Sequence, residues 1–298
     1  MKAIGIDIGG TKIAAGIITD TGKLLHSVKV KSDRTNREKM FARVVAAVEQ
    51  LLDESQLSIA DMAGIGVGVP GKVDCDKGIA VFQNNLPWQQ FPLQARLQEQ
   101  FQPKQITLDN DVYMAAFAEA NAAKASNEET FVYVTISTGI SCCIIHKGEF
   151  FRGAGFAGEL GLIPVLAHGE NKRLETVAAG PAIEQIAKQK LADDALTAAA
   201  VFARYQHGVR EGNIIIDTAA AQLAQGLYSL SCLMDPHRIV FGGSVIVHNP
   251  FFLDLVKEKL ANYVLPEQRH LLANMTISGL AQDNGVIGAG LRVLSASM

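Results

Sequence analysis

Three short loops of the sequence combine glycine with hydroxyl side chains. They are Gly9-Gly10-Thr11-Lys12 just after Asp7, Ser137-Thr138-Gly139, and Gly242-Gly243-Ser244. Backbone N–H groups of a tight glycine turn can reach phosphate oxygens, Thr11 and Lys12 add donors, and a carboxylate such as Asp7 can hold Mg²⁺ through its waters. A glycine-rich hairpin turn capped by aspartate is the structural alternative for the first loop. The repetition of the loop type favours phosphate binding.

A polar run, Asp109-Asn110-Asp111, follows a short apolar strand and precedes an expected helix. Aspartate and asparagine are ordinary N-caps at such a place, which is the structural alternative. Because capping needs only one of the three residues, another is available as a general base. Phosphoryl transfer to an alcohol needs such a carboxylate within hydrogen-bond reach of the attacking hydroxyl.

Two further polar groups lie in apolar or glycine-rich surroundings, namely Asn84-Asn85 ahead of Trp88 and Glu159 within the segment 158–161. Amide and carboxylate groups supply the donors and acceptors that sugar hydroxyls need. A turn and a solvated glutamate are the structural alternatives. Trp88 is interpreted as a packing residue. His168 lies in a polar loop without cysteines, and one histidine makes no metal site.

The elements that must position these residues repeat along the chain. Apolar runs at residues 3–8, 13–18 and 24–30, separated by the first glycine loop and a turn at residues 20–22, predict a three-stranded meander. The same succession of strand, small-residue loop, strand, glycine turn and strand recurs at residues 131–152. This self-similarity predicts two related halves.

Helices are indicated by apolar residues spaced by three and four, most clearly from Met40 to Leu52 after a start at Arg37. Others are expected at residues 91–101, directly after Asp111, and at residues 218–234 and 251–263. No linker or low-complexity tract interrupts the chain.

The length of 298 residues favours two domains. We expect a smaller N-terminal α/β domain over residues 1–115 and a larger α/β domain over residues 116–284. A final helix at about residues 285–298 is expected to pack back on the first domain.

The common nucleotide-binding motifs are absent from the sequence. It contains neither a Walker motif nor the protein-kinase set. Residues 64–71 have the glycine spacing of a dinucleotide fingerprint, but Pro70 stops the strand and turn residues follow where that fingerprint needs a helix. Hairpin loops from the two halves would instead hold a triphosphate in a cleft between domains.

Composition excludes several classes of function. Lys plus Arg (27) against Asp plus Glu (30) gives a net charge of −3, so nucleic acid is not an expected partner. The four cysteines lack the spacing of a disulfide framework or a zinc ribbon, which favours a reducing, cytoplasmic location. Asp7 interrupts the first apolar run, and no stretch of about 18 uncharged apolar residues follows. Neither secretion nor a membrane span is expected.

An ordered set of motifs along nearly the whole chain resembles the ROK family (repressors, open reading frames, sugar kinases). The motifs are residues 7–12, Pro70-Gly71, Asn85-Leu86-Pro87, Asn110-Asp111, Ser137-Thr138-Gly139, residues 158–161, Leu174-Glu175 through Ala179-Gly180, and Gly242-Gly243-Ser244. The resemblance implies the two-domain actin-like ATPase (ribonuclease H-like) fold with an inter-domain cleft. It also implies ATP and Mg²⁺ as cofactors and a sugar as the small-molecule substrate.

Residue roles follow from the same resemblance. Asp111 would be the catalytic base and Asp7 would serve the magnesium ion. The sugar would be contacted by Asn85, Asn110, Glu159 and Glu175. The phosphates would be bound by Gly9, Gly10, Thr11 and Lys12 together with Thr138 and Gly139, and the adenosine side by Gly242 and Gly243. A homodimer is implied as well.

Two departures from the family pattern change the expectations. Leu162 stands where the family usually has a histidine, and residues 168–173 replace its zinc-binding cysteines, so no zinc site is expected. Because that histidine usually also contacts the sugar, the substrate identity is open. In addition, the segment from Ser137 to Cys143 replaces a more glycine-rich nucleotide loop.

Three functions are compatible with the resemblance. The first is an ATP-dependent sugar kinase acting on a hydroxyl, expected to be the 6-hydroxyl, of a hexose or N-acetylhexosamine. Zinc-less members such as N-acetylmannosamine, β-glucoside and allose kinases are comparable. The second is a sugar-sensing regulator, disfavoured because the first strand begins within about three residues of Met1 and leaves no DNA-reading module. The third is a non-catalytic sugar-binding protein.

Overall fold

The computed structural model describes residues 1–83, 85–167, 169–280 and 282–296. The chain divides into two compact units, one formed by Met1–Ala125 with the segment from Gln282 onward and the other by Ser126–Ala281. The boundary expected near residue 115 lies within a continuous helix, α3 (Asp111–Ala122), and the first unit extends past the end of that helix. Asn84, His168 and the last two residues of the expected final helix lie outside the described residues.

The first unit is built on a five-stranded sheet with the strand order β3-β2-β1-β4-β8. β1 (Lys2–Ile8), β2 (Lys12–Thr19) and β3 (Leu24–Lys31) form the predicted antiparallel meander. β4 (Ile65–Val69) and β8 (Ile106–Asn110) continue the sheet in parallel with β1. The carboxyl ends of β1, β4 and β8 therefore meet at one edge of the sheet, where Asp7, Gly68 and Asp109 stand in register.

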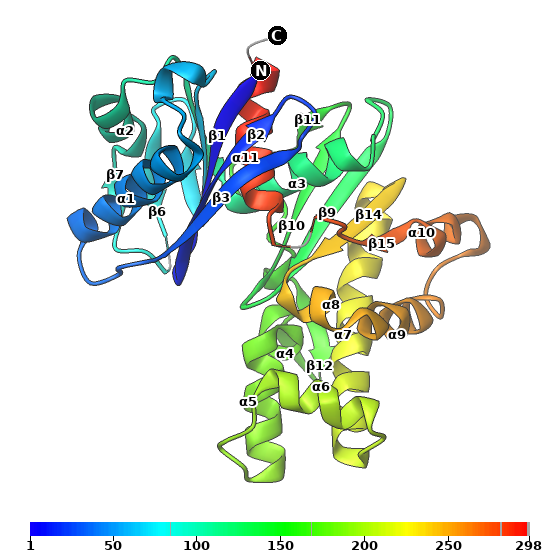
Figure 1. Ribbon diagram of the computed structural model, residues 1–298. Coiled ribbons are helices and arrows are strands. Elements are labelled where there is room, and N and C mark those ends of the chain that lie inside the picture. The colour runs from blue at the N-terminus through cyan, green and yellow to red at the C-terminus, as the bar shows by residue number, and fades with distance from the viewer. Residues whose placement is uncertain (84, 168, 281, 297–298) are drawn as a thin grey trace. The chain divides into compact units, whose positions relative to one another are not determined.

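Two helical layers cover this sheet. α1 (Arg37–Ser55), capped by Asn36, packs the predicted apolar face from Met40 to Leu51 on one side. On the other side lie α3 and α11 (Asn284–Ala296), the latter beside β1 in Figure 1. α2 (Leu93–Phe101) and the 3₁₀ turn η1 (Ile59–Asp61) complete the helices of this unit. A small sheet of β5 (Lys72–Asp74), β6 (Ile79–Phe82) and β7 (Gln89–Phe91) was not predicted from the sequence.

Glycines on adjacent strands allow α11 to approach the sheet closely. Gly5 is in register with Gly16 on β2 and with Gly66 on β4. A Cβ on Gly5 would overlap the carbonyl oxygen of Val286, and a Cβ on Gly66 would overlap that of Ala289. These positions place helix backbone directly on strand backbone, a contact that any side chain would prevent.

The second unit repeats the design of the first. β9 (Thr130–Ile136), β10 (Ile140–His146) and β11 (Glu149–Phe150) form the second meander, and β14 (Arg238–Gly242) and β15 (Met275–Ile277) extend it in parallel to β9. The order β11-β10-β9-β14-β15 matches that of the first sheet. The predicted repeat of the meander is confirmed.

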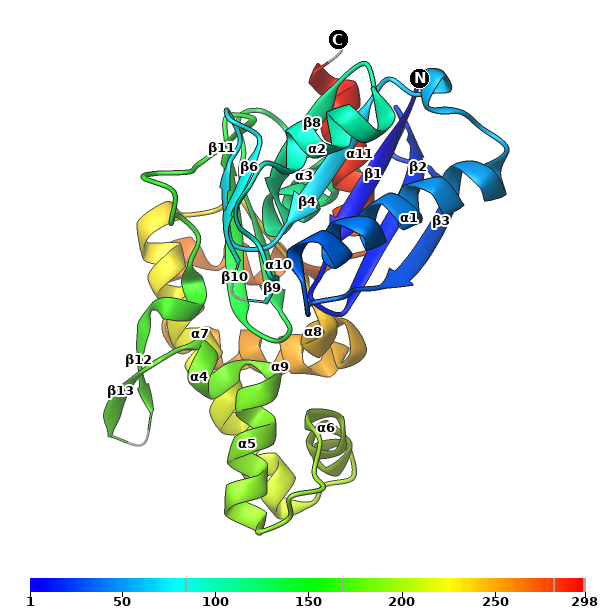
Figure 2. The same ribbon diagram turned by 90° about the vertical axis from the view of Figure 1, so that its left-hand side faces the viewer.

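The helices of the second unit follow its meander in the chain, and β14 and β15 lie among them. The helical elements are α4 (Glu175–Ala178), α5 (Gly180–Leu191), α6 (Ala198–Gln206), α7 (Arg210–Met234), α8 (Ser244–His248), α9 (Pro250–Leu260), α10 (His270–Ala273) and the 3₁₀ turns η2 (Leu160–Leu162) and η3 (Pro266–Gln268). α7 begins at Arg210, before the predicted start at residue 218, and the added turns bury Gly212, Ile215 and Ile216. A hairpin of β12 (Pro164–Ala167) and β13 (Glu170–Arg173) was not predicted. It lies next to α4 and α7 in Figure 2.

Within the described ranges, no helix has both the length and the apolar character that a membrane crossing requires.

The close contact of α11 with the sheet generates a stability prediction. Gly66→Ala should lower the free energy of unfolding by about 2 kcal/mol or more, because the added methyl group overlaps backbone and forces the helix away. Gly279→Ala is the matched control, since a Cβ there meets no atom within 4 Å. Urea unfolding followed by circular dichroism measures both, and equal loss in the two variants would contradict the contact.

Candidate active site

The residues singled out in the sequence fall into two sets, one within each unit. The first unit holds Asp7, Gly9, Gly10, Thr11, Lys12, Asn85, Asn110 and Asp111. The second holds Thr138, Gly139, Glu159, Glu175, Gly242 and Gly243.

Asp7 lies one residue before the end of β1, where the backbone of α11 crowds it. Gly285 packs directly on its carboxyl group, since a Cβ there would lie 2.8 Å from Asp7 Cγ. Burial raises the pKa of Asp7 to about 6, and the positive charge of Lys12 opposes this shift. Among the described residues, this carboxylate has no hydrogen-bond donor. It is therefore a poorly solvated negative charge that a cation would stabilise.

The loop from Gly9 to Lys12 is a closed turn between β1 and β2. The N–H of Gly9 donates to the Lys12 carbonyl at 2.9 Å, and the Ser32 hydroxyl donates to the Gly9 carbonyl at 2.6 Å. The amides of Gly10 and Thr11 donate to no acceptor in the described part of the chain. The turn therefore presents two open N–H groups at its tip, while Lys12 Nζ donates to Gln282 Oε1 at 2.9 Å.

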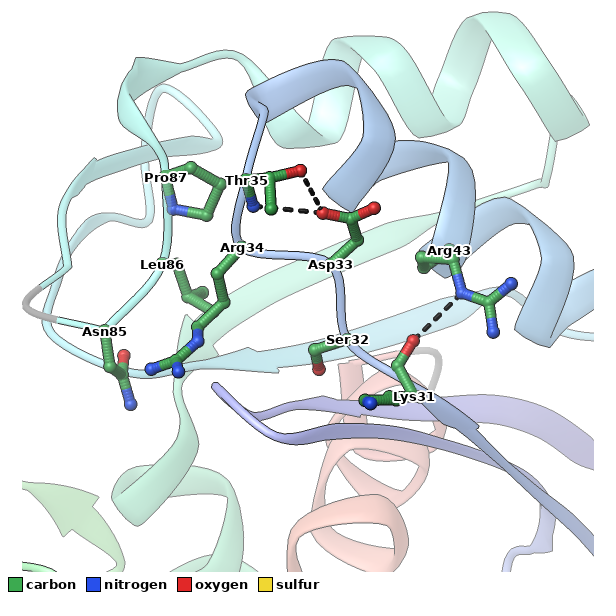
Figure 3. Close-up of a pocket in the computed structure, with 9 residues that line it drawn as sticks. All are labelled: Lys31, Ser32, Asp33, Arg34, Thr35, Arg43, Asn85, Leu86 and Pro87. Carbon is green, nitrogen blue, oxygen red and sulfur yellow. Dashed lines mark hydrogen bonds between the residues drawn. The ribbon is translucent and has the colours of Figure 1, made fainter.

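Asn85 lies directly against this loop. A Cβ on Gly10 would be 3.1 Å from Asn85 Nδ2, so the side chain rests on the glycine. Asn85 also lines an open pocket together with Lys31, Arg34 and Arg43, and in Figure 3 the guanidinium group of Arg34 lies beside the Asn85 amide. This basic pocket was not predicted, although the polar residues 31–35, which follow β3, are a sequence signal for a loop there.

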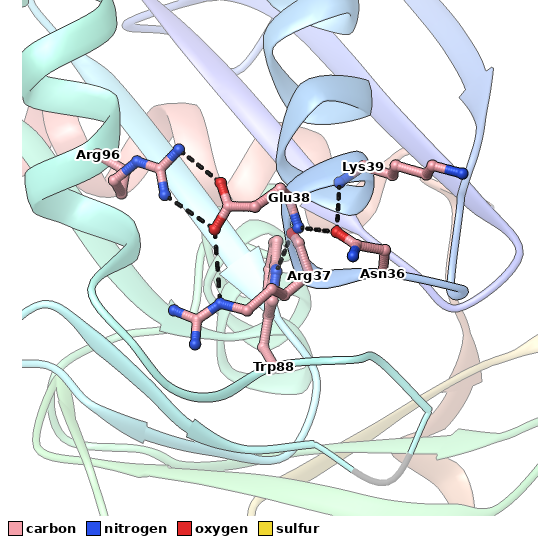
Figure 4. Close-up of polar contacts among 6 residues, drawn as sticks. All are labelled: Asn36, Arg37, Glu38, Lys39, Trp88 and Arg96. Carbon is pink, nitrogen blue, oxygen red and sulfur yellow. Dashed lines mark hydrogen bonds and ion pairs between the residues drawn. The ribbon is translucent and has the colours of Figure 1, made fainter.

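A network of polar contacts fixes the chain just after Asn85. Trp88 is 2% exposed, stacks on Phe91 with ring centroids 4.7 Å apart, and donates from Nε1 to the Arg37 carbonyl at 3.0 Å. Arg96 forms a bidentate ion pair with Glu38 at 2.8 and 3.3 Å (Figure 4). The interpretation of Trp88 as a packing residue is confirmed. The packing ties the segment that carries Asn85 to α1.

The three polar side chains at the end of β8 make different hydrogen bonds. Asp109 is 3% exposed and accepts the backbone N–H of Asn110 at 2.8 Å. Asn110 is the N-cap of α3, because its oxygen accepts the N–H of Val112 at 2.9 Å while its amide donates to the Gly71 carbonyl at 2.9 Å. Asp111 begins the helix, and its Oδ1 accepts the same N–H of Val112 at 2.9 Å. The cap thus uses Asn110 and positions Asp111 in the first turn.

In the second unit, the loop Ser137-Thr138-Gly139 connects β9 and β10. Its ends are bonded to each other and to α5, since Ser137 N–H donates to the Gly139 carbonyl and Gly180 N–H donates to the Ser137 carbonyl, both at 2.9 Å. Cys142 and Cys143, which end the segment that differs from the glycine-rich family pattern, are buried in β10 and do not fill the loop.

Gly242 and Gly243 lie where β14 turns into α8. Gly243 has φ +84°, and a Cβ there would overlap the Ile136 carbonyl, so the position requires glycine. The next residue, Ser244, forms a hydroxyl–hydroxyl hydrogen bond with Ser137 at 3.0 Å. These two loops border a pocket of about 340 Å³ whose walls include Phe202 of α6 and the start of α5.

Glu159 and Glu175 form a pair of neighbouring carboxylates. Glu175 lies over two glycines, because a Cβ on Gly161 would be 3.1 Å from its Oε2 and one on Gly139 would be 3.4 Å away. Burial and, secondarily, the charge of Glu175 raise the pKa of Glu159. Burial and, secondarily, the charge of Glu159 raise the pKa of Cys142 to about 12, so this thiol stays protonated. The two acids suit a ligand that donates several hydroxyl groups.

The segment expected to lack zinc forms part of a hairpin. Residues 170–173 are the exposed strand β13, and Leu162, at the place of the family's histidine, is 42% exposed. Of the residues that the structure describes, no three His, Cys, Asp or Glu side chains are grouped to hold a metal ion. The absence of zinc stays a prediction.

Comparisons with known proteins cover almost the entire chain. The sequence pattern of the ROK family matches residues 3–295. The chain is 28% identical to a glucokinase of Halalkalibacterium halodurans, covering 96% of this chain and 93% of that one. It is 29% identical to an N-acetylmannosamine kinase of Pasteurella multocida (97% and 95%) and 25% identical to a xylose repressor of Caldicellulosiruptor bescii (98% and 78%).

Solved structures give the same result at the level of the fold. The ROK hexokinase of Thermus thermophilus superposes with a TM-score of 0.83 at 30% identity, covering 100% of this chain and 99% of that one. A ROK family glucokinase of Streptomyces griseus, crystallised with glucose and AMPPNP, superposes with a TM-score of 0.80 at 25% identity (97% and 98%). The expected actin-like ATPase fold is confirmed.

The raised pKa of Asp7 generates a prediction on stability against pH. Below about pH 4 the carboxyl is neutral in the folded and unfolded states alike. As the pH rises above 4, Asp7 ionises in the unfolded chain but stays protonated in the folded protein up to about pH 6. The free energy of unfolding therefore falls over this interval and levels off above pH 6. Asp7→Asn lacks this loss and should exceed the wild type at pH 7.5 by up to about 3 kcal/mol in free energy of unfolding.

Urea unfolding at pH 5 and pH 7.5 in metal-free buffer measures the difference. The exposed Asp254→Asn is the control and should follow the wild type at each pH. A gain from Asp7→Asn that is the same at both pH values would contradict the raised pKa.

Proposed function

The chain belongs to the ROK family, and we propose that it is an ATP-dependent sugar kinase that phosphorylates the 6-hydroxyl of a hexose or N-acetylhexosamine. The observation that carries this proposal is the contact of Asn85 with Gly10, whose loop presents two open amides. Phosphoryl transfer requires a phosphate-binding group and a sugar-binding group at one place. The relatives named glucokinase and N-acetylmannosamine kinase support both types of acceptor.

Phosphate binding falls to the open loop of the first unit. The amides of Gly10 and Thr11, the Thr11 hydroxyl and the ammonium group of Lys12 are donors for phosphate oxygens. Lys12 would exchange its hydrogen bond to the neutral Gln282 for one to a phosphate oxygen. The new hydrogen bond would be stronger because both groups are charged. In the second unit, Thr138 and Gly139 would bind phosphates, and the pocket beside Gly242 and Gly243 would hold the adenosine.

Asp7 fits the magnesium ion that ATP carries. Its carboxylate is half-buried and accepts no hydrogen bond from the described residues, and burial raises its pKa. A hydrated cation beside it would stabilise the ionised form of this carboxylate. Binding through waters needs no second acidic ligand, in agreement with the absence of a grouped set among the described residues. The ion would supply charge neutralisation to the β- and γ-phosphates.

The acceptor hydroxyl requires a base, and we assign this role to Asp111. Its Oδ1 is held by the N–H of Val112 at the start of α3, and the helix dipole stabilises its negative charge. The carboxylate would accept the proton of the attacking hydroxyl. Asn110 keeps one N–H and one lone pair after its capping bonds, enough for a sugar hydroxyl.

Glu159 and Glu175 would bind further hydroxyls of the sugar. Hydroxyl groups that donate to both carboxylates would offset their mutual repulsion and lower the raised pKa of Glu159. The sugar is thereby held by acceptors, which favours an uncharged, hydroxyl-rich ring over an anion.

We also propose a homodimer, from the likeness to the family, and a cytoplasmic location, from the cysteine spacing. Light scattering in solution measures the first.

The assignment of Asp111 is tested by the substitution Asp111→Asn. The amide can still accept the N–H of Val112, so the helix start stays intact while the base is lost. The turnover number should fall by about 10²- to 10⁴-fold, with the melting temperature unchanged. A coupled assay of ADP release, run over glucose, mannose, N-acetylglucosamine and N-acetylmannosamine, measures it.

Undiminished turnover in Asp111→Asn would remove this residue from the chemistry. Sugar binding by calorimetry with no turnover of any sugar would instead favour the regulator or the non-catalytic binding protein.

A further inference from the structure

The basic pocket beside Asn85 has no role in the proposed phosphoryl transfer. It has a volume of about 860 Å³ and lies within the first unit. Its three cationic side chains come from different elements, namely Lys31 from the end of β3, Arg34 from the loop that follows, and Arg43 from α1 (Figure 3). Three elements therefore bring positive charge to one place.

These three cations differ from their neighbours in lacking acidic partners. Lys29 pairs with Asp283 at 3.3 Å, and Arg37 pairs with Glu38 at 3.5 Å. In the part of the chain that the structure describes, none of the three pocket cations forms an ion pair. Their charges are available to a ligand.

Asp33 is the acid among the described lining residues, and its carboxylate is engaged in a turn. Its Oδ1 accepts the N–H of Thr35 at 3.0 Å and the Thr35 hydroxyl at 2.5 Å. These hydrogen bonds hold the pKa of Asp33 below its usual range. One negative charge does not balance three positive ones, so the pocket keeps an excess of positive charge, whereas the chain as a whole has a net charge of −3.

Backbone contacts fix the pocket against the first glycine loop. The N–H of Ser32 donates to the Thr11 carbonyl at 3.0 Å, and its hydroxyl donates to the Gly9 carbonyl at 2.6 Å. Arg43 Nε donates to the Lys31 carbonyl at 2.9 Å, which leaves the two terminal amino groups of this guanidinium for a ligand. The cations are thus held beside the residues that we propose to bind phosphate and sugar.

The chemistry of the pocket favours an oxyanion. Guanidinium groups bind carboxylate and phosphate with two parallel hydrogen bonds, and an ammonium group adds a further charged donor. The volume lies in the range of sites for whole small molecules, so the oxyanion would be part of a larger ligand. Because Asn85 lines the same pocket, that ligand is the sugar.

We propose that the basic pocket binds a phosphate or carboxylate substituent of the acceptor, so that the enzyme prefers a hexose or N-acetylhexosamine that carries such a group over the neutral sugar. The inference rests on the proposed function, because it takes Asn85 as a contact of the sugar. The charge is on a substituent, since ring hydroxyls are assigned to Glu159 and Glu175. Arg34 is then a specificity residue that pairs with the anionic group.

The anionic substituent takes no part in the bond changes. The 6-hydroxyl oxygen forms a bond to the γ-phosphorus of ATP, the bond from that phosphorus to the bridging oxygen of ADP breaks, and Asp111 accepts the hydroxyl proton. The products are ADP and a sugar with one phosphate group more than the acceptor.

The test compares neutral and anionic acceptors in the full chain. Glucose is paired with glucose 1-phosphate, and N-acetylglucosamine is paired with its lactyl ether, N-acetylmuramate. Each pair keeps the 6-hydroxyl and differs by one anionic group, a phosphate in the first pair and a carboxylate in the second. ADP release gives kcat/KM, and calorimetry gives the affinity for each sugar. At least one anionic sugar should exceed its neutral partner in kcat/KM by about tenfold or more, the effect of one charged hydrogen bond.

The variant Arg34→Gln removes one pocket charge without disturbing the fold, because this exposed side chain makes no hydrogen bond or ion pair with the described residues. It should lower kcat/KM for the preferred anionic sugar by about tenfold or more, mainly through KM, and leave the neutral sugar unchanged. Arg269→Gln is the matched control, since it removes an exposed arginine outside the pocket, and it should keep the wild-type values for both sugars.

Three results would overturn the inference while the proposed function stands. The first is a kcat/KM for both anionic sugars that is equal to or below that of their neutral partners. The second is an unchanged affinity and kcat/KM for the anionic sugar in Arg34→Gln. The third is an increased KM for ATP in Arg34→Gln, which would assign the pocket to the phosphate donor.

Failure of the proposed function has a different signature, namely that no sugar is turned over. Calorimetry then decides on the pocket by itself. Binding of an anionic sugar that Arg34→Gln weakens by about tenfold would retain the anion site, and absence of such binding would reject it.

Discussion

The contact between α11 and the first sheet is the constraint on which the candidate site depends. Gly5 and Gly66 permit backbone-to-backbone packing, and the start of the same helix places Gly285 on the carboxyl of Asp7. One rigid helix thus fixes the sheet, limits the solvation of Asp7 and so raises its pKa. The electrostatics of the metal-binding candidate follow from a packing interaction.

The repeated meander explains why glycine loops recur at corresponding places. In each unit the first and second strands form a tight hairpin, and the following parallel strands bring further loops to the same edge of the sheet. A hairpin tip between two buried strands must expose its amides, which is the geometry that an anion needs. The duplication therefore supplies, from one local design, the two loops that we propose to bind phosphate.

Much of this could be predicted from the sequence, for physical reasons. Continuous apolar runs separated by glycine loops and turns predicted both meanders, and spacing by three and four predicted α1. The polar run at the end of β8 predicted the helix cap, which is Asn110. β13 escaped prediction because all four of its residues are exposed and carry no alternation. Gln222 is a polar residue of an amphipathic helix and would be expected at the surface, but tertiary packing around α7 leaves it 3% exposed. The roles of Asp111 and the other site residues remain proposals.

The first unit is discontinuous in the chain, and this has a consequence for synthesis on the ribosome. Residues 126–281 form a continuous unit that can complete its core as soon as they emerge. The first sheet, although made earlier, keeps the glycine row of Gly5 and Gly66 uncovered until α11 is translated. The unit that is begun first is therefore the last that can complete its core, and the sheet face without α11 during that interval is where a chaperone is most useful.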